Sequence, residues 1–199
     1  MVKKIIITGG LGYIGTELCK IYSGVSWHHK IIVIDNRFIS ERVNQIRNWN
    51  MEFIHGDILN KELVNKYFKD ADIVHHLAGI TDVPRTKSES NSEKDKKIIL
   101  VGEKGTNNIL EAISNECKII FPSTHVVYEG IDKVKNDIKE NEETKPVLSY
   151  SSSKAANEKQ LKKSGKNYVI LRLGSVYGYS TDTARIDIMP NLFSKISSE

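Results

Sequence analysis

The chain has 199 residues, of which 39% are hydrophobic and 27% charged, and its formal net charge is +4. These values are ordinary for a soluble globular protein of one domain with a sizeable core. The lysines are dispersed and form no basic run with interleaved aromatic residues, so we expect no nucleic-acid partner. No apolar run approaches membrane-spanning length, and the N-terminus enters a predicted strand at once, so we expect neither a membrane segment nor a signal peptide.

The two cysteines, Cys19 and Cys117, lie far apart, one in helix-like sequence and one just before a predicted strand. This arrangement favours reduced structural thiols over a disulfide or a metal pair. We therefore expect a cytoplasmic protein without a metal site.

The first predicted strand is the apolar run Ile5–Thr8, which is typical of a strand buried on both faces of a parallel sheet. The pattern Gly9-x-x-Gly12-x-x-Gly15 follows it, and a helical pattern begins at Tyr13. In such a turn Gly9 permits the tight bend, Gly12 lets the backbone approach a phosphate, and Gly15 lets helix and strand pack closely. The helix N-terminus then presents free N–H groups to a pyrophosphate, so this stretch predicts a dinucleotide site.

A second buried strand, Lys30–Ile34, ends at Asp35, about 20 residues after Gly15, the spacing of the acidic residue in dinucleotide-binding folds. A carboxylate there accepts hydrogen bonds from the adenosine ribose and repels a 2′-phosphate, which favours NAD over NADP. Arg37 nearby leaves NADP open, because an arginine accommodates that phosphate.

The next segment is predicted as a short helix or loop over Glu41–Asn48, followed by a strand over Met51–His55. Asp57 follows that strand, where it could reach the adenine amino group or cap the predicted helix Lys61–Phe68. The sequence leaves these two roles equally open.

A fourth strand is predicted over Ala71–Leu77, and the small residues Ala78 and Gly79 after it permit close approach of a cofactor. His75 and His76 are adjacent and therefore point to opposite faces of this strand, so they cannot share a metal ion. We expect both to lie in the core or along the ligand crevice.

The remaining segments continue the alternation of helices and strands. We predict a loop over Ile80–Lys96, a helix over Lys97–Ser114, a strand over Lys118–Phe121, a polar excursion over Glu129–Lys145, a helix ending at Gly165, a strand over Tyr168–Leu173 and a helix over Arg185–Ile196 containing Pro190. Right-handed crossovers then require an α/β fold with a doubly wound parallel sheet, the Rossmann fold.

Tyr150 and Lys154 are spaced i, i+4, so on a helix both side chains project from one face. A nearby ammonium favours the phenolate, which makes the tyrosine usable as an acid and base. Thr124 supplies a hydroxyl at the end of the fifth predicted strand, on the same side as the glycine loop. Together these residues predict proton transfer at a substrate hydroxyl or carbonyl beside a hydride-transferring cofactor.

With these motifs, the chain resembles the extended short-chain dehydrogenase/reductase family, and in particular its nucleotide-sugar epimerase/dehydratase branch. The matching motifs are TGGLGYIG (Thr8–Gly15), Asp35, GDI (Gly56–Ile58), HLAG (His76–Gly79), GTNNILEA (Gly105–Ala112), STHVVY (Ser123–Tyr128), YSSSK (Tyr150–Lys154) and LRLGSVYG (Leu171–Gly178). They occur in the family's order over nearly the whole chain.

The resemblance implies a set of site residues, an NAD cofactor, a nucleotide-diphosphate-sugar substrate and a homodimer formed by the helices Lys97–Ser114 and Ser152–Lys163. The implied catalytic residues are Thr124, Tyr150 and Lys154. The implied cofactor contacts are Gly9, Gly12, Tyr13, Ile14, Gly15, Asp35, Asn36, Asp57, Ile58, Leu77, Ala78, Gly79, Tyr150 and Lys154. The implied substrate contacts are Thr81, Ser123, Thr124, His125 and Ser175.

Several positions depart from the family pattern. The 4,6-dehydratases carry Asp-Glu directly after the catalytic threonine, whereas His125 and Val126 stand here, and the glutamate of the sugar-acid decarboxylases is also absent at Val126. This leaves epimerases, with a dTDP-4-keto-sugar reductase as the alternative because Glu129-Gly130 is similar to the reductase pattern. Gly102 also stands where the family has an asparagine.

Family members continue into a smaller substrate-binding lobe. We expect residues 1–178 to form the NAD-binding domain with the catalytic residues, and residues 179–199 to be the start of a lobe that is largely absent. A chain of this kind is then a fragment or a natural short form, and a catalytically incomplete NAD-binding regulatory module is a further alternative.

Overall fold

The computed structural model of the chain describes residues 1–81, 92–180 and 188–198. Its elements are β1 (Lys4–Thr8), α1 (Tyr13–Ser23), β2 (Lys30–Asp35), α2 (Ser40–Asn48), β3 (Glu52–His55), α3 (Lys61–Phe68), β4 (Ile73–His76), α4 (Ser92–Ala112), β5 (Lys118–Thr124), the 3₁₀ helix η2 (His125–Tyr128), α5 (Ser149–Lys163), β6 (Asn167–Leu173) and α6 (Met189–Ser198).

The strands form one six-stranded sheet in the order β3-β2-β1-β4-β5-β6, and every adjacent pair is parallel. The sheet therefore winds outward in both directions from β1 and β4, which confirms the predicted Rossmann fold. Thr8 at the end of β1 is in register with Ile34 on β2 and with His76 on β4. The carboxyl ends of the central strands consequently meet at one edge of the sheet, where ligands bind in folds of this type.

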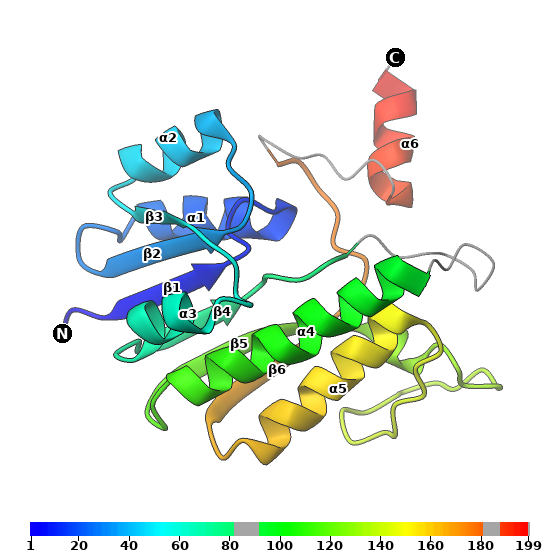
Figure 1. Cartoon of the computed structure of the whole chain (residues 1–199). Coiled ribbons are helices and arrows are strands. Elements are labelled where there is room, and N and C mark those ends of the chain that lie inside the picture. The colour runs from blue at the N-terminus through cyan, green and yellow to red at the C-terminus, as the bar shows by residue number, and fades with distance from the viewer. Residues whose placement is uncertain (82–91, 181–187, 199) are drawn as a thin grey trace.

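Helices cover both faces of the sheet, and each face has its own core (Figure 1). On one side α3, α4 and α5 follow one another, with α4 packed between the other two. On the other side α1 and α2 pack over the β1–β2–β3 half. Successive isoleucines of β1 alternate between the two cores, with Ile6 in the first and Ile5 and Ile7 in the second, as expected for a strand buried on both faces.

Each core contains one of the free cysteines. Cys117 belongs to the first core and Cys19 to the second, and both side chains are fully buried. The prediction of two reduced structural thiols is confirmed.

The largest differences from the predicted boundaries lie at the starts of α4 and α6. Helix α4 begins at Ser92, so the predicted loop Ile80–Lys96 is wrong over its last five residues (92–96), while residues 82–91 of that loop lie outside the described residues. Glu93 and Asp95 occupy the first turn of α4, where carboxylates stabilise the helix dipole.

Helix α6 begins at Met189, and the predicted start at Arg185 lies outside the described residues. Pro190 is therefore in the first turn, where its missing N–H costs no helical hydrogen bond, rather than inside the helix.

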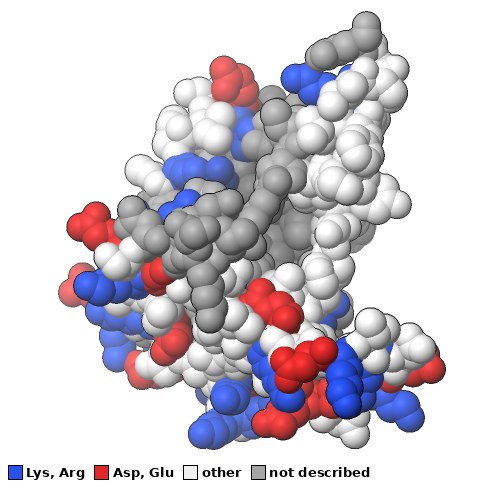
Figure 2. Space-filling view, turned by 90° about the vertical axis from the view of Figure 1, so that its right-hand side faces the viewer, with Lys and Arg blue, Asp and Glu red and all other residues white. Residues whose placement is uncertain are grey.

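The surface of this fold carries charges of both signs. Figure 2 shows lysine, arginine, aspartate and glutamate side chains interspersed on the visible face, with a largely uncharged area in its upper right. Among the described residues, no helix combines the length and apolar character needed to cross a membrane.

Candidate active site

The glycine loop between β1 and α1 has the geometry that its sequence predicts. Gly9 has a φ of +68°, and a Cβ atom there would lie 2.8 Å from the backbone nitrogen of Ala78. A Cβ on Gly15 would lie 2.3 Å from the carbonyl oxygen of Gly9. Gly9 thus supplies the left-handed turn and Gly15 the close packing of helix on loop, as predicted.

The N-terminus of α1 provides the donors that a diphosphate requires. Gly12 is its N-cap, and within the described part of the chain no side chain caps this end. The first N–H groups of a helix have no partner within the helix and carry a partial positive charge. Ile14 is 37% exposed in the first turn, so this end of the helix is open to the surroundings.

Tyr13, the first residue of α1, connects the glycine loop to the end of the chain. Its hydroxyl donates to the carbonyl oxygen of Gly178 and accepts a 3.2 Å hydrogen bond from the side-chain amide of Asn191 on α6. Asn191 also accepts from the N–H of Gly178 at 3.0 Å. No local pattern predicts this contact, because it joins residues at opposite ends of the chain.

Asp35 is buried at the end of β2 and holds the glycine loop in place. Its Oδ2 accepts from the N–H of Leu11 at 2.9 Å, and its Oδ1 accepts from the N–H of Arg37 at 2.9 Å and from Arg37 Nε at 3.3 Å. The carboxylate therefore fixes loop and strand to one another besides being available to a ribose, since each oxygen accepts more than one bond. The sequence predicted only the second role.

Asp57 lies beside Asn36 at the ends of neighbouring strands. Asp57 Oδ2 accepts from the Asn36 amide at 3.2 Å, and Oδ1 accepts from the N–H of Leu59 at 2.9 Å. The alternative that Asp57 caps α3 is wrong, because Asn60 is the N-cap and accepts from the N–H of Leu63 at 3.1 Å. Ile58 is buried in the first core, so only its backbone is available to a cofactor.

A buried polar chain links the glycine turn to α4 through His76. Thr8 Oγ1 lies 3.1 Å from His76 Nδ1, and His76 Nε2 lies 2.9 Å from Thr106 Oγ1. Burial, with a smaller effect of the charge of Lys154, lowers the pKa of His76 to about 3, so its ring is neutral. Thr8 also accepts from the N–H of Ala78 at 3.0 Å, which fixes the small residues that follow β4.

His75 points to the other face, as predicted, and its Nε2 lies 2.8 Å from the hydroxyl of Tyr22. Burial lowers its pKa below the usual value. Leu77 is partly buried against the second core, and Gly79 has open space on the side where a Cβ would stand. Thr81 is exposed beyond them.

Tyr150 and Lys154 on α5 face the segment after β4 across one pocket. The pocket is lined by Ala78, Gly79 and Ile80 after β4, by Gly102 and Thr106 of α4, and by Tyr150, Ser153, Lys154 and Asn157 of α5, among others. Lys154 Nζ lies 5.9 Å from the centre of the Tyr150 ring and 4.4 Å from that of Phe121, and it donates to the carbonyl oxygen of Pro122 at 2.7 Å. Burial lowers the pKa of Lys154 to about 8.

Thr124 is buried at the end of β5 and is the N-cap of η2. Its Oγ1 accepts from the N–H of Val126 at 3.3 Å. A hydroxyl that accepts one hydrogen bond can still donate its own proton and accept a second bond. His125 is exposed with Nδ1 3.2 Å from the carbonyl oxygen of Leu173, and Ser175 is exposed after β6.

Ser123 has a different environment from the one predicted. Its hydroxyl is buried and donates to Glu158 Oε1 at 2.6 Å. The hydroxyl therefore joins an internal ion-pair network, and its contact with a substrate stays a prediction.

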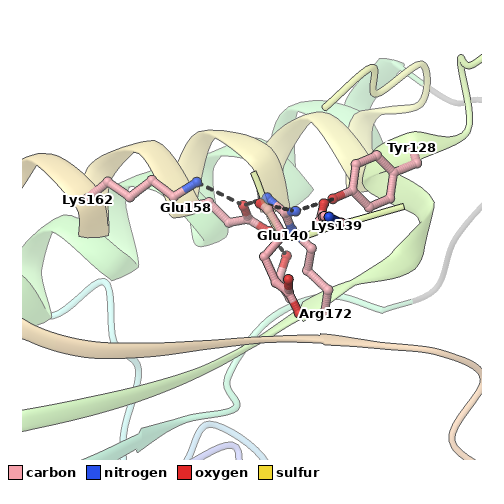
Figure 3. A network of polar contacts seen from close by, with 7 residues as sticks. Tyr128, Lys139, Glu140, Glu158, Lys162 and Arg172 are labelled. Atoms are coloured by element: carbon pink, nitrogen blue, oxygen red, sulfur yellow. Dashed lines mark hydrogen bonds and ion pairs between the residues drawn. The ribbon is translucent and has the colours of Figure 1, made fainter. Parts of the chain in front are cut away.

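This network centres on Glu158 and Arg172 (Figure 3). Arg172 donates from Nε to Glu158 Oε1 at 2.9 Å and from Nη2 to Oε2 at 2.6 Å. Burial alone would raise the pKa of Glu158, but hydrogen bonds from Arg172 and Ser123 lower it overall. Arg172 also donates to the hydroxyl of Tyr128 and to the carbonyl oxygen of Glu140 at 2.9 Å, so the network fastens the loop before α5 to β6.

The comparisons with known proteins agree with this geometry. The family model described as "NAD dependent epimerase/dehydratase family" matches residues 5–199. The chain is 31% identical over 198 residues to a dTDP-D-glucose 4,6-dehydratase of Dictyostelium discoideum, covering 89% of this chain and 44% of that protein. It is 33% identical over 205 residues to a CDP-paratose 2-epimerase of Salmonella typhi, covering 88% of this chain and 58% of that protein.

Among solved structures, the chain is similar to a UDP-glucuronic acid 4-epimerase variant of Bacillus cereus in complex with NAD and a fluorinated UDP-sugar. The TM-score is 0.79 at 25% identity, over 98% of this chain and 64% of that one. The chain spans about half the length of the curated relatives that it matches. The resemblance drawn from the motifs is confirmed, and the chain belongs to the NAD dependent epimerase/dehydratase family.

Proposed function

We propose that this chain acts as an NAD-dependent nucleotide-sugar epimerase with its cofactor and catalytic residues within residues 1–178. The observation that carries the proposal is the pocket in which Tyr150 and Lys154 face Ala78 and Gly79. Ala78 contacts the glycine turn at Gly9, so the pocket adjoins the dinucleotide loop. Residues 179–199 are proposed to belong to a substrate-binding lobe.

The residues present fit a dinucleotide. The uncapped start of α1 suits the diphosphate, and the buried carboxylate of Asp35 suits the adenosine ribose. The open side of Gly79 leaves room beside Tyr150 and Lys154 for the nicotinamide end. Bound NAD would supply a reversible hydride acceptor, which is the chemistry an epimerase requires.

The side chains divide the proton chemistry between them. The Lys154 ammonium favours the phenolate form of Tyr150, which takes the proton of a sugar hydroxyl and, as the phenol, returns it. Thr124 donates its O–H to the same sugar oxygen and holds it in place, since a hydroxyl that accepts from Val126 can still donate.

The choice of an epimerase rests on two considerations. The relatives include a CDP-paratose 2-epimerase and several UDP-glucose 4-epimerases. His125 and Val126 supply none of the carboxylates that dehydration or decarboxylation would use beside Thr124. The first of the relatives named above is nevertheless a 4,6-dehydratase, so the activity has to be measured directly.

The test is incubation of the chain with NAD and a panel of UDP-, dTDP-, CDP- and GDP-sugars, with the products identified by NMR. An epimerised sugar without net NADH supports the proposal, and Tyr150→Phe should abolish it with unchanged NAD affinity. Tyr168→Phe, on the exposed side of β6, is the matched control. Net oxidation of NADH by a 4-keto-sugar would identify a reductase, and NAD binding without any turnover would identify a binding module.

We also propose a homodimer through α4 and α5, which pack side by side on one face of the sheet (Figure 1). Ile99 and Leu100 on α4 are 38% and 48% exposed, and burial against a second copy would remove them from water. Sedimentation should give a dimer at micromolar concentration and a monomer for Leu100→Glu. A cytoplasmic location is proposed from the two reduced thiols.

A further inference from the structure

A single carboxylate anchors the chain where it enters the helix that carries Tyr150. Glu129 Oε1 accepts from the N–H of Val147 at 2.6 Å and from the N–H of Leu148 at 2.7 Å, and the hydroxyl of Ser151 also donates to it. These donors lie just before α5 and in its first turn. Three donors on one carboxylate oxygen make this a strongly held contact, because hydrogen bonds to an ionised acceptor are the stronger kind.

The helix has no other acidic residue at this end. Its first turn contains none, and its N-cap is Leu148, whose apolar side chain has no acceptor. Helices ordinarily begin at Ser, Thr, Asp or Asn, which satisfy the first N–H groups from within the segment. Glu129 instead holds the N–H groups of the two residues just before α5, Val147 and Leu148, together with the side-chain hydroxyl of Ser151 in the first turn.

The position of Glu129 links the two segments that carry the proposed proton-transfer groups. Glu129 directly follows η2, which begins at its N-cap Thr124, and Tyr150 is the second residue of α5. Backbone hydrogen bonds run beside the carboxylate, from Gly130 to the carbonyl oxygen of Lys145 and from Lys145 to that of Val127, each at 2.8 Å. The start of α5 is therefore fastened to the end of η2.

We infer that Glu129 is a positioning residue that sets the first turn of α5, and with it the Tyr150 phenol, relative to Thr124. This inference rests on the proposed function, because it assigns the phenol its proton-transfer role. Lys154 lies one turn further along and has its own anchor at the carbonyl oxygen of Pro122. Loss of Glu129 should therefore release Tyr150 while leaving Lys154 and the glycine loop in place.

The experiment compares Glu129→Ala, Glu129→Gln and the wild-type chain, with Glu143→Ala as control. Glu143 is exposed in the same loop, and among the described residues it has no recorded hydrogen bond or ion pair. Amide exchange is measured over residues 146–153, together with NAD affinity, kcat and KM. A 3-fluorotyrosine label reports on Tyr150 by ¹⁹F NMR, and the resonance is assigned by its loss in Tyr150→Phe.

In Glu129→Ala we expect amide exchange at the start of α5 to be about tenfold faster, because Val147, Leu148 and the Ser151 hydroxyl lose their common acceptor. We also expect a shifted or broadened Tyr150 resonance and kcat at least about tenfold lower, with NAD affinity within about twofold of wild type. Glu129→Gln keeps an acceptor oxygen and should restore most of kcat and of the exchange protection. Glu143→Ala should change none of these quantities.

Unchanged exchange and an unchanged Tyr150 resonance in Glu129→Ala would overturn the inference, as would a parallel loss of NAD affinity, which would mean general disruption. If Glu129→Ala fails to fold, the test rests on Glu129→Gln. If Glu129 is a positioning residue, the Tyr150 resonance and kcat of Glu129→Gln should lie near the wild-type values. If the wild-type chain turns over no nucleotide-sugar, the proposed function fails, while the exchange and ¹⁹F measurements still decide the role of Glu129.

Discussion

Replacing Lys154 by methionine should stabilise the fold while it removes the ammonium that is proposed to assist Tyr150. Burial lowers the pKa of Lys154 from its ordinary 10.5 to about 8. Each tenfold change in proton affinity corresponds to about 1.4 kcal/mol, so holding the ammonium charged in the fold costs about 3 kcal/mol. The carbonyl oxygen of Pro122 loses its donor in the variant, which offsets about 1 kcal/mol. Since the side chain is only partly buried, we expect a net gain of about 1–2 kcal/mol at pH 7.

The stability advantage of Lys154→Met over wild type should depend on pH. Below about pH 8 the lysine is charged in both folded and unfolded states, and the variant has its full advantage. Between pH 8 and 10.5 the unfolded state binds more protons than the folded state, so wild-type stability rises with pH and the advantage shrinks. Urea unfolding of wild type and Lys154→Met at pH 7, 8.5 and 10 measures this, with the exposed Lys159→Met on the same helix as control. A variant that is less stable at pH 7, or an advantage independent of pH, would refute the reasoning.

Three further outcomes follow from the contacts described. Gly15→Ala should lose at least about 2 kcal/mol of unfolding free energy together with NAD binding, because the added Cβ would lie 2.3 Å from a backbone atom. The control Gly24→Ala should be nearly neutral in urea unfolding, because the nearest atom to its added Cβ lies at 3.8 Å. The pKa of His76 is lowered to about 3 in the folded state, so below pH 6.5 the unfolded state binds one more proton than the folded state. Wild-type stability should therefore fall toward acid pH by up to about 1.4 kcal/mol per pH unit, and His76→Gln should flatten that slope. Arg172→Met should cost about 3–5 kcal/mol, because the buried Glu158 carboxylate loses its hydrogen-bonded cation at 2.6 Å and keeps only Lys162 at 3.7 Å, and adding Glu158→Gln should recover part of the loss in thermal unfolding.

The sequence predicted those parts of the fold that depend on a local residue pattern. Apolar runs such as Ile5–Thr8 predicted strands buried on both faces, and the spacing of Gly9, Gly12 and Gly15 predicted the conformation of the loop. Asn60, a residue type that favours the N-cap, stands directly before α3 and is its N-cap, whereas the sequence alone also allowed Asp57 in that role.

What the sequence did not reveal depends on contacts between distant segments. The first turn of α4 is polar, so it lacks the apolar period that marked the rest of that helix. The pairing of Glu129 with the start of α5 crosses a loop whose path no local pattern describes. The motifs predict Ser123 and Tyr13 as ligand contacts but give no sign of their observed partners, Glu158 and Asn191, which lie far along the chain.

The two cysteines give a means of following how the molecule opens. Burial raises the pKa of Cys19 to about 12 and that of Cys117 to about 11, so neither thiol forms appreciable thiolate in the closed fold. One thiol lies in each of the two cores. The labelling rate of each single-cysteine variant by a maleimide therefore records the transient exposure of one layer. Equal rates would show that both layers unfold as one cooperative unit, and unequal rates would show that one side of the sheet unfolds locally without the other.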